Sequence, residues 1–126
     1  MNSSPPLTTF VEQGVLIVAP GPDYATIYEG MLQEFDALVE RAQAAESPLL
    51  LFDLQHTKYV GSAFLGLLLR VSNVITVQRQ GRFGLCNLTK FCKTIFATTK
   101  MQLHCEIFET REEALAAFTA NQSPSS

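Results

Sequence analysis

Two side chains stand out in this sequence because of where they occur: the hydroxyl of Ser62 and the carboxyl of Asp53. Ser62 opens a run in which apolar residues recur at helical spacing, and Asp53 is the one acid in an otherwise apolar segment. A serine at the start of a helix can accept hydrogen bonds from the free N–H groups of the first turn. We therefore predict that Ser62 is an N-cap residue, and we expect function to lie at this turn.

Asp53 needs a polar partner if it is buried, because an unpaired carboxylate is costly in an apolar environment. Hydrogen bonding to the following loop, Gln55–Gly61, would satisfy it and shape the loop. No second carboxylate or histidine stands at a fixed spacing to form an acid–base pair. We therefore expect Asp53 to shape this loop, and we expect no catalytic residue.

Cysteine and histidine give no sign of a metal or redox centre. The three cysteines, Cys86, Cys92 and Cys105, form no CxxC pair, and His56 and His104 lie far apart. An odd number of cysteines without this spacing favours reduced thiols in a cytoplasm over disulfides. We expect all three to be core residues, and we expect no metal and no cofactor, since GxGxxG and P-loop patterns are absent too.

The stretch around Ser62 predicts a strand, a connection and a long helix. Leu49–Leu54 is short and apolar, as is typical of a strand covered on both faces. Gln55–Gly61 is polar and ends in glycine, so we expect a loop. The helix from Ser62 is predicted to end at Gly81. Its buried stripe comprises Phe64, Leu67, Leu68, Val71, Val74 and Ile75.

The residues before this stretch predict a hairpin and a helix. Leu7–Gln13 and Val15–Ala19 are two apolar segments joined at Gly14, which favours an antiparallel pair with a tight turn. Asp23 is a plausible cap for a helix running to about Ala45. Its predicted buried face comprises Ile27, Met31, Phe35, Leu38, Val39 and Ala42.

The remaining residues predict two further strand–helix units. Arg82–Asn87 is a strand, and Thr89 is expected to cap a helix running to about Lys100. Leu103–Phe108 is the last strand, and the capping-box pattern that begins at Thr110 predicts a final helix. The inward faces of these two helices are predicted to comprise Phe91, Cys92, Ile95, Phe96 and Thr99, and Ala114, Leu115 and Phe118.

The resulting order, β-β-α-β-α-β-α-β-α, predicts an α/β domain whose later strands are parallel. The loops after such strands carry function, and both Asp53 and Ser62 fall at that edge. We expect one domain over residues 7–120 between flexible ends, 1–6 and 121–126.

Composition narrows the classes of partner. The 126 residues carry a net charge of −3, with Lys and Arg scattered along the chain. Nucleic-acid binding proteins usually have a clustered basic face, so we expect no nucleic-acid partner. The apolar runs are far shorter than the ~20 residues of a membrane span. The first residues, MNSSPPLTTF, lack the pattern of a secretory signal.

The element order, and the segment FDLQHTKYVGSAFLGLLL in particular, resemble the STAS family. The family pattern is a strand ending in Asp-Leu, a short loop, then Asp-Ser-Ser/Ala-Gly and a Leu-rich helix. Here Asp53-Leu54 matches the strand end, Ser62-Ala63 the serine pair, and Leu65–Leu69 the helix. The closing segment, Phe108–Phe118, also fits the family's last strand and helix.

This resemblance implies a bacterial anti-sigma factor antagonist without enzymatic activity. In the family, the serine that matches Ser62 is phosphorylated by a partner that is both a serine kinase and an anti-sigma factor. Phosphorylation ends the binding between the two proteins, and a phosphatase restores it. We expect such a partner to bind through the loop Gln55–Gly61 and the start of the following helix, at His56, Thr57, Lys58, Tyr59, Gly61, Ser62, Ala63, Leu65 and Leu69.

Two positions depart from the family pattern. Gly61 replaces the acid that usually precedes the serine, and Phe64 replaces the glycine that usually closes the motif. The first change alters the charge that a kinase would read, and the second adds bulk. They favour an alternative function, a STAS-like scaffold or small-ligand module without phosphoregulation. A small flavin or thiol enzyme is the weakest alternative, because the sequence contains no motif for one.

Overall fold

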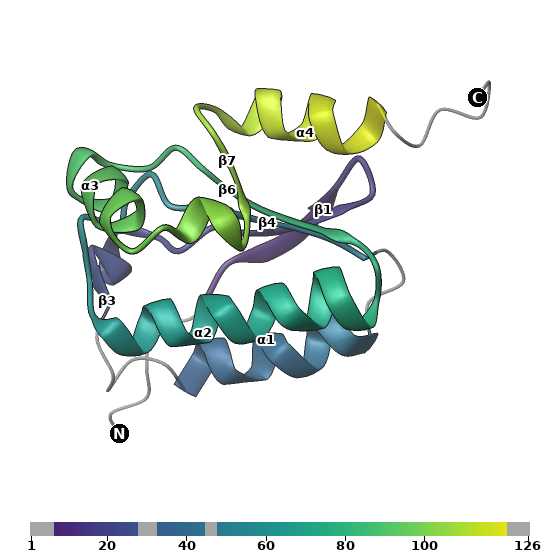
Figure 1. The fold of residues 1–126 in the computed structure, drawn as a ribbon, viewed down its shortest axis with the longest axis horizontal. Coiled ribbons are helices and arrows are strands. Elements are labelled where there is room, and N and C mark those ends of the chain that lie inside the picture. The colour runs from purple at the N-terminus through teal and green to yellow at the C-terminus, as the bar shows by residue number, and fades with distance from the viewer. Residues whose placement is uncertain (1–6, 28–32, 45–47, 121–126) are drawn as a thin grey trace.

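A five-stranded sheet forms the centre of the protein (Figure 1), and the computed structural model describes residues 7–27, 33–44 and 48–120. The strand order is β1-β2-β4-β6-β7. The pair β1–β2 is antiparallel and the other three pairs are parallel, as the sequence predicts. The bounds are β1 Thr9–Glu12, β2 Val15–Val18, β4 Leu49–Asp53, β6 Arg82–Cys86 and β7 Glu106–Phe108.

Helices cover both faces of this sheet (Figure 1). Helices α1 and α2 lie side by side on one face, and α4 lies on the other. Helix α3 lies at one end of the molecule, near the short strand β3. None of the described helices is long and apolar enough to cross a membrane. The bounds are α1 Gln33–Ala44, α2 Ser62–Ser72, α3 Lys90–Thr98 and α4 Arg111–Ala120.

The alternating side chains of β4 divide the core into two clusters. Leu50 and Phe52 point to the α1/α2 face, where they pack with residues of both helices. Leu49 and Leu51 point to the α4 face and pack with that helix. Because β4 is buried on both faces, its sequence is almost continuously apolar. Asp53 continues the α4-facing series, and this sets its orientation.

A second, two-stranded sheet was not predicted. It pairs β3, Thr26–Ile27, in parallel with β5, Tyr59–Val60. The segment predicted as a loop, Gln55–Gly61, therefore contains a strand. The prediction of a helix starting at Asp23 is wrong as well, because Pro22–Tyr24 is a single 3-10 turn and Ile27 belongs to β3.

Two helix ends differ from the prediction. The α-helical bonds of α2 stop at Ser72, and a π-helical segment, Asn73–Gln78, continues the helix before Gly81. Residues Met101–Leu103 form a 3-10 turn, so the last strand is shorter than the expected Leu103–Phe108. The expected flexible ends, 1–6 and 121–126, lie outside the described residues. So do 28–32, which include Met31, and 45–47, where the first helix was predicted to end.

Candidate functional site

Ser62 is an exposed residue in the first turn of α2, but it is not the N-cap. That position belongs to Gly61, whose φ and ψ of −92° and 171° are extended. The reason is the small sheet: the Gly61 N–H donates to the carbonyl of Ile27 at 2.8 Å, which holds the backbone extended for one more residue. The prediction that Ser62 caps the helix is therefore wrong by one position.

The first turn of α2 is open to water at its N-terminal end. Intrahelical bonding starts with the Phe64 N–H, which donates to the Gly61 carbonyl at 3.1 Å. Among the described residues, nothing accepts from the N–H groups of Ser62 and Ala63, and nothing bonds to the Ser62 hydroxyl. Such free N–H groups and the helix dipole make the position favourable for negative charge.

The loop before Ser62 presents most of the expected partner-binding residues to solvent. His56, Lys58 and Tyr59 are exposed, and Gly61 is partly exposed. Thr57 is the exception, because it is completely buried. Its carbonyl accepts a hydrogen bond from the Thr89 hydroxyl at 2.8 Å, which ties the loop to α3. The side chain of Thr57 therefore does not share the exposed surface of its neighbours.

On α2 itself, Ala63 and Leu65 are partly buried against the core, whereas Leu69 is 40% exposed. Phe64 is fully buried, and its ring lies 5.4 Å from that of Phe35. The residue that replaces the family's glycine is thus a core side chain.

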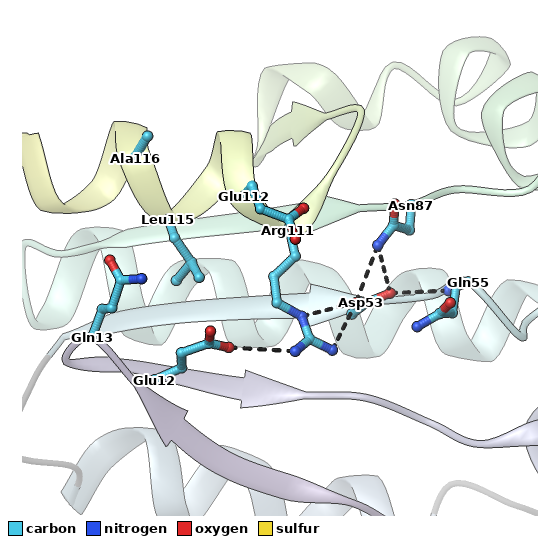
Figure 2. Close-up of a pocket in the computed structure, with 9 residues that line it drawn as sticks. All are labelled: Glu12, Gln13, Asp53, Gln55, Asn87, Arg111, Glu112, Leu115 and Ala116. Carbon is cyan, nitrogen blue, oxygen red and sulfur yellow. Dashed lines mark hydrogen bonds and ion pairs between the residues drawn. The ribbon is translucent and has the colours of Figure 1, made fainter.

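Asp53 lies at the end of β4, where it is 1% exposed and surrounded by hydrogen-bond donors (Figure 2). The Gln55 N–H donates to its carboxylate at 3.2 Å, which joins Asp53 to the loop. The Asn87 amide donates to both oxygens at 3.2 and 3.1 Å. Arg111 forms an ion pair with it at 3.0 Å. Every buried polar atom of this carboxylate is therefore satisfied.

Arg111 connects Asp53 to the hairpin, because its guanidinium also lies 3.3 Å from a carboxylate oxygen of Glu12. Burial lowers the pKa of Arg111, but the hydrogen bond and charge of Asp53 outweigh this, so that the pKa is raised overall. These residues line a hollow of about 540 Å³ at this edge of the sheet. Figure 2 shows how their side chains lie. One guanidinium thus pairs with two carboxylates from different strands, which suits a structural role.

Sequence reasoning missed Asn87 and Arg111. Asn87 follows β6, the parallel neighbour of β4, and the pairing of Asp53 with Cys86 places Asn87 beside the carboxylate. This neighbourhood could have been inferred from the parallel order. Arg111 comes from α4, 58 residues away, and no local sequence signal indicates where that helix docks.

The three cysteines are free and buried, as predicted. Burial, followed by the charge of Asp53, raises the pKa of Cys86 to about 12. Burial also raises the pKa of Cys105 to about 12. Neither thiol is a ready nucleophile, since the thiolate is the reactive form.

No protein-family model matches this sequence, and no match is found among curated proteins. Solved structures do match. An anti-sigma-factor antagonist (STAS) domain protein from Planctomyces limnophilus has a TM-score of 0.82 and 23% identity, over 92% of this chain and 99% of its own. A candidate anti-sigma factor antagonist from Thermotoga maritima has a TM-score of 0.78 and 16% identity, over 89% of this chain and 93% of its own.

An anti-sigma factor antagonist from Mycobacterium paratuberculosis has a TM-score of 0.67 and 22% identity, over 92% of this chain and 98% of its own. The chain therefore has the STAS-domain fold, as the resemblance in sequence predicts. At these identities the likeness extends to the fold and not to the activity.

Proposed function

We propose that this protein is a stand-alone STAS-domain regulator of the anti-sigma factor antagonist type, acting in a bacterial cytoplasm. In this proposal it binds a serine-kinase anti-sigma factor through the loop 55–61 and the start of α2. Phosphorylation of Ser62 ends the binding. The protein itself catalyses no reaction, and its output is the release of the partner's own target.

The observation that carries the proposal is the exposed Ser62 hydroxyl at the open N-terminus of α2. A phosphate adds about −1.5 to −2 charges at pH 7. The free N–H groups of Ser62 and Ala63 can bond to its oxygens, so the fold tolerates the modification. A partner surface packed on Ser62 would instead have to desolvate that charge or be repelled by it. Modification can therefore break the contact and leave the fold intact.

The test compares Ser62→Asp with Ser62→Ala. The partner is first co-purified from native cells and identified as an ATP-binding, kinase-like protein. We expect Ser62→Ala to bind it as the wild type does, and Ser62→Asp to lose binding while its circular-dichroism melt stays near wild type. Equal binding by the two variants would contradict the phosphorylation switch.

A second candidate function is a STAS-like scaffold or small-ligand module without phosphoregulation. The observation that favours it is the replacement of motif residues: Gly61 leaves no acid beside Ser62, and Phe64 is part of the core. Intact-mass analysis of protein purified from its native host separates the two candidates. A phosphoform at Ser62 supports the regulated antagonist, and its absence under every growth condition supports the scaffold.

A further inference from the structure

Two aromatic rings lie together on the surface just before Ser62. Tyr59, in β5, and Phe91, in α3, have ring centroids 4.9 Å apart at an interplanar angle of 60°. Their exposed fractions are 53% and 39%. The predicted stripe of α3 would have buried Phe91, and that prediction is wrong. Exposed aromatic side chains that gather in one place are typical of interaction sites, because they offer large apolar area at low entropic cost.

The backbone beneath this pair is firmly held. The N–H groups of Lys58 and Tyr59 both donate to the carbonyl of Ala25, at 2.7 and 3.0 Å. The Thr89 hydroxyl, which precedes Lys90, donates to the Thr57 carbonyl at 2.8 Å and so ties the loop to the start of α3. A surface ordered before binding loses less conformational entropy when a partner docks.

Charge is sharply divided along the chain. Seven of the nine Lys and Arg residues lie between Leu54 and Cys105, and none of the twelve Asp and Glu residues does. The expectation that Lys and Arg are scattered is therefore wrong. The loop before α2, α2 itself and α3 all belong to this basic segment, whereas the acids lie outside it, among them Glu12 in β1, Asp53 in β4 and Glu106 in β7.

Two of these cations flank the aromatic pair. Lys58 precedes Tyr59 and Lys90 precedes Phe91, and both lysines are exposed. Within the described part of the chain, neither ammonium group has a carboxylate within ion-pair distance. Lys93, one turn further along α3, differs because it pairs with Glu109 at 3.3 Å.

We propose that Lys58, Tyr59, Lys90 and Phe91, here called the aromatic–lysine patch, dock an acidic, amphipathic segment of a protein partner. The rings would receive an apolar side chain, and the two free ammonium groups would receive carboxylates. The inference deepens the proposed function and rests on it for the identity of the partner. It specifies the chemistry that such a partner must present.

The charge division favours a short acidic protein segment over a nucleic acid. A nucleic acid extends well beyond two lysines, but Lys93, the next cation along α3, is already paired with Glu109 at 3.3 Å. An acidic protein segment can end where the patch ends. Complementary charge of this kind speeds association and selects partners.

The position of the patch also links it to Ser62. The chain runs from Tyr59 through Val60 and Gly61 to Ser62, so the Cα atoms of Tyr59 and Ser62 are at most about 11 Å apart. This is comparable with the Debye length of about 8 Å at physiological ionic strength. A phosphate on Ser62 would therefore repel an acidic segment bound to the patch.

The test uses a defined probe, a short synthetic peptide in which Glu and Leu alternate, and the same peptide with Lys in place of Glu. Each is titrated into ¹⁵N-labelled protein. We expect amide shifts to cluster at the four patch residues with the acidic peptide only, and to weaken as salt is added. Shifts elsewhere, or equal binding of the basic peptide, would overturn the proposal. So would tighter binding of oligo-dT at the same residues, or concentration-dependent shifts there without any peptide.

Three variants test which side chains bind the acidic peptide. We expect Lys58→Glu/Lys90→Glu to weaken binding of the acidic peptide by about tenfold or more. Tyr59→Ala/Phe91→Ala should weaken it at every salt concentration. The matched control is Lys100→Glu, which reverses an exposed charge just beyond the C-terminal end of α3 and should change binding less than about twofold. Equal loss in all three variants would contradict a localised patch.

The two proposals can fail separately. If the kinase-like partner fails to bind Ser62→Asp but binds Lys58→Glu/Lys90→Glu normally, the patch proposal is wrong and the phosphorylation switch is supported. If the acidic peptide binds at the patch but Ser62→Asp leaves partner binding unchanged, the phosphorylation switch is wrong and the patch proposal is supported.

Discussion

At the scale of single residues, Asp53 shows how a buried charge is kept in an apolar strand. It is 1% exposed and is bonded by Gln55, Asn87 and Arg111. We expect Asp53→Ala to lower the free energy of unfolding by about 2–4 kcal/mol, because it leaves the partly buried Arg111 and Asn87 without their acceptor. Urea unfolding followed by circular dichroism measures this.

The control is Glu12→Gln, which removes the other, more exposed carboxylate beside the same guanidinium. A surface ion pair of this kind contributes about 1 kcal/mol or less. If the two variants lost the same stability, the buried position of Asp53 would not be what makes it important.

Because Cys86 and Cys105 are buried, we expect the protein to lose stability at high pH. Burial raises the pKa of both Cys86 and Cys105 to about 12, from an ordinary thiol value of 9.0. Below pH 9 the thiols are protonated in the folded and unfolded states alike. As the pH rises from 9 towards 12, only the unfolded thiols release protons, so the unfolded state gains stability.

We therefore expect the urea midpoint to fall as the pH rises above 9, and to fall less steeply in the variant Cys86→Ala/Cys105→Ala. Parallel pH profiles would show that other groups cause the loss. Alkylation by iodoacetamide at pH 8 should be slow in the folded protein and fast in urea, since folding hides both thiols.

The sequence predicted that Asp53 needs a partner, and it indicated the wrong cap at Ser62. The first inference depends only on an acid in an apolar run. The second depends on whether the backbone turns at residue 61 or 62, which the pairing of Gly61 with Ile27 decides. Contacts between distant segments therefore set the details that local patterns leave open.

At the scale of elements, two glycines have opposite roles. A Cβ at Gly81 would lie 1.8 Å from the carbonyl oxygen of Pro48, whereas a Cβ at Gly66, in the interior of α2, would meet nothing within 4 Å. We expect Gly81→Ala to destabilise the protein by about 3 kcal/mol, because backbone must shift. Gly66→Ala should stabilise it by about 0.5–1 kcal/mol through helix propensity.

Thermal unfolding of the two variants measures this contrast. A neutral Gly81→Ala would show that the contact between Gly81 and Pro48 can open without cost. A destabilising Gly66→Ala would show that the added methyl group contacts a neighbouring group after all.

Long, periodic elements were predictable, and short ones were not. The predicted apolar stripe of α2 and the predicted capping box of α4 are both confirmed. In the capping box, the Glu113 N–H donates to the Thr110 hydroxyl at 3.1 Å. Strands β3 and β5 have two residues each, too few to show a period of two. They exist because distant segments meet, and their pairing helps to present Tyr59.

At the scale of the whole molecule, the sheet separates two apolar clusters that share its strands. Phe118 is fully buried in the α4-side cluster, 5.6 Å from the ring of Phe108. We expect Phe118→Ala to lower the free energy of unfolding by about 3–5 kcal/mol. Because β4 contributes to both clusters, unfolding should remain one cooperative transition.

Far-ultraviolet circular dichroism follows the loss of the helices, and near-ultraviolet circular dichroism follows the packing of tyrosines such as the buried Tyr24. Tyr24 lies in the cluster on the opposite face of the sheet, so comparing the two signals tests whether both faces unfold together. Coincident transitions in Phe118→Ala support shared cooperativity. Loss of α4 before the tyrosine signal changes would show that the two faces unfold independently.

The order and mostly parallel direction of the strands were predictable because strands and helices alternate in the sequence. The aromatic–lysine patch was not, since it requires the tertiary pairing of Tyr59 with Phe91. The charge division, in contrast, is visible in the sequence once acids and bases are counted by segment.

The strand order also has a consequence for synthesis. Each main strand lies beside the one made before it, with Leu16 pairing with Leu50, Leu50 with Phe83, and Leu85 with Ile107. A chain emerging from the ribosome can therefore build the sheet outward from the first hairpin, and no strand has to be inserted between two that are already joined. The growing edge is always the newest strand, so it is the nascent chain, rather than the finished protein, that exposes β4 and β6 to aggregation.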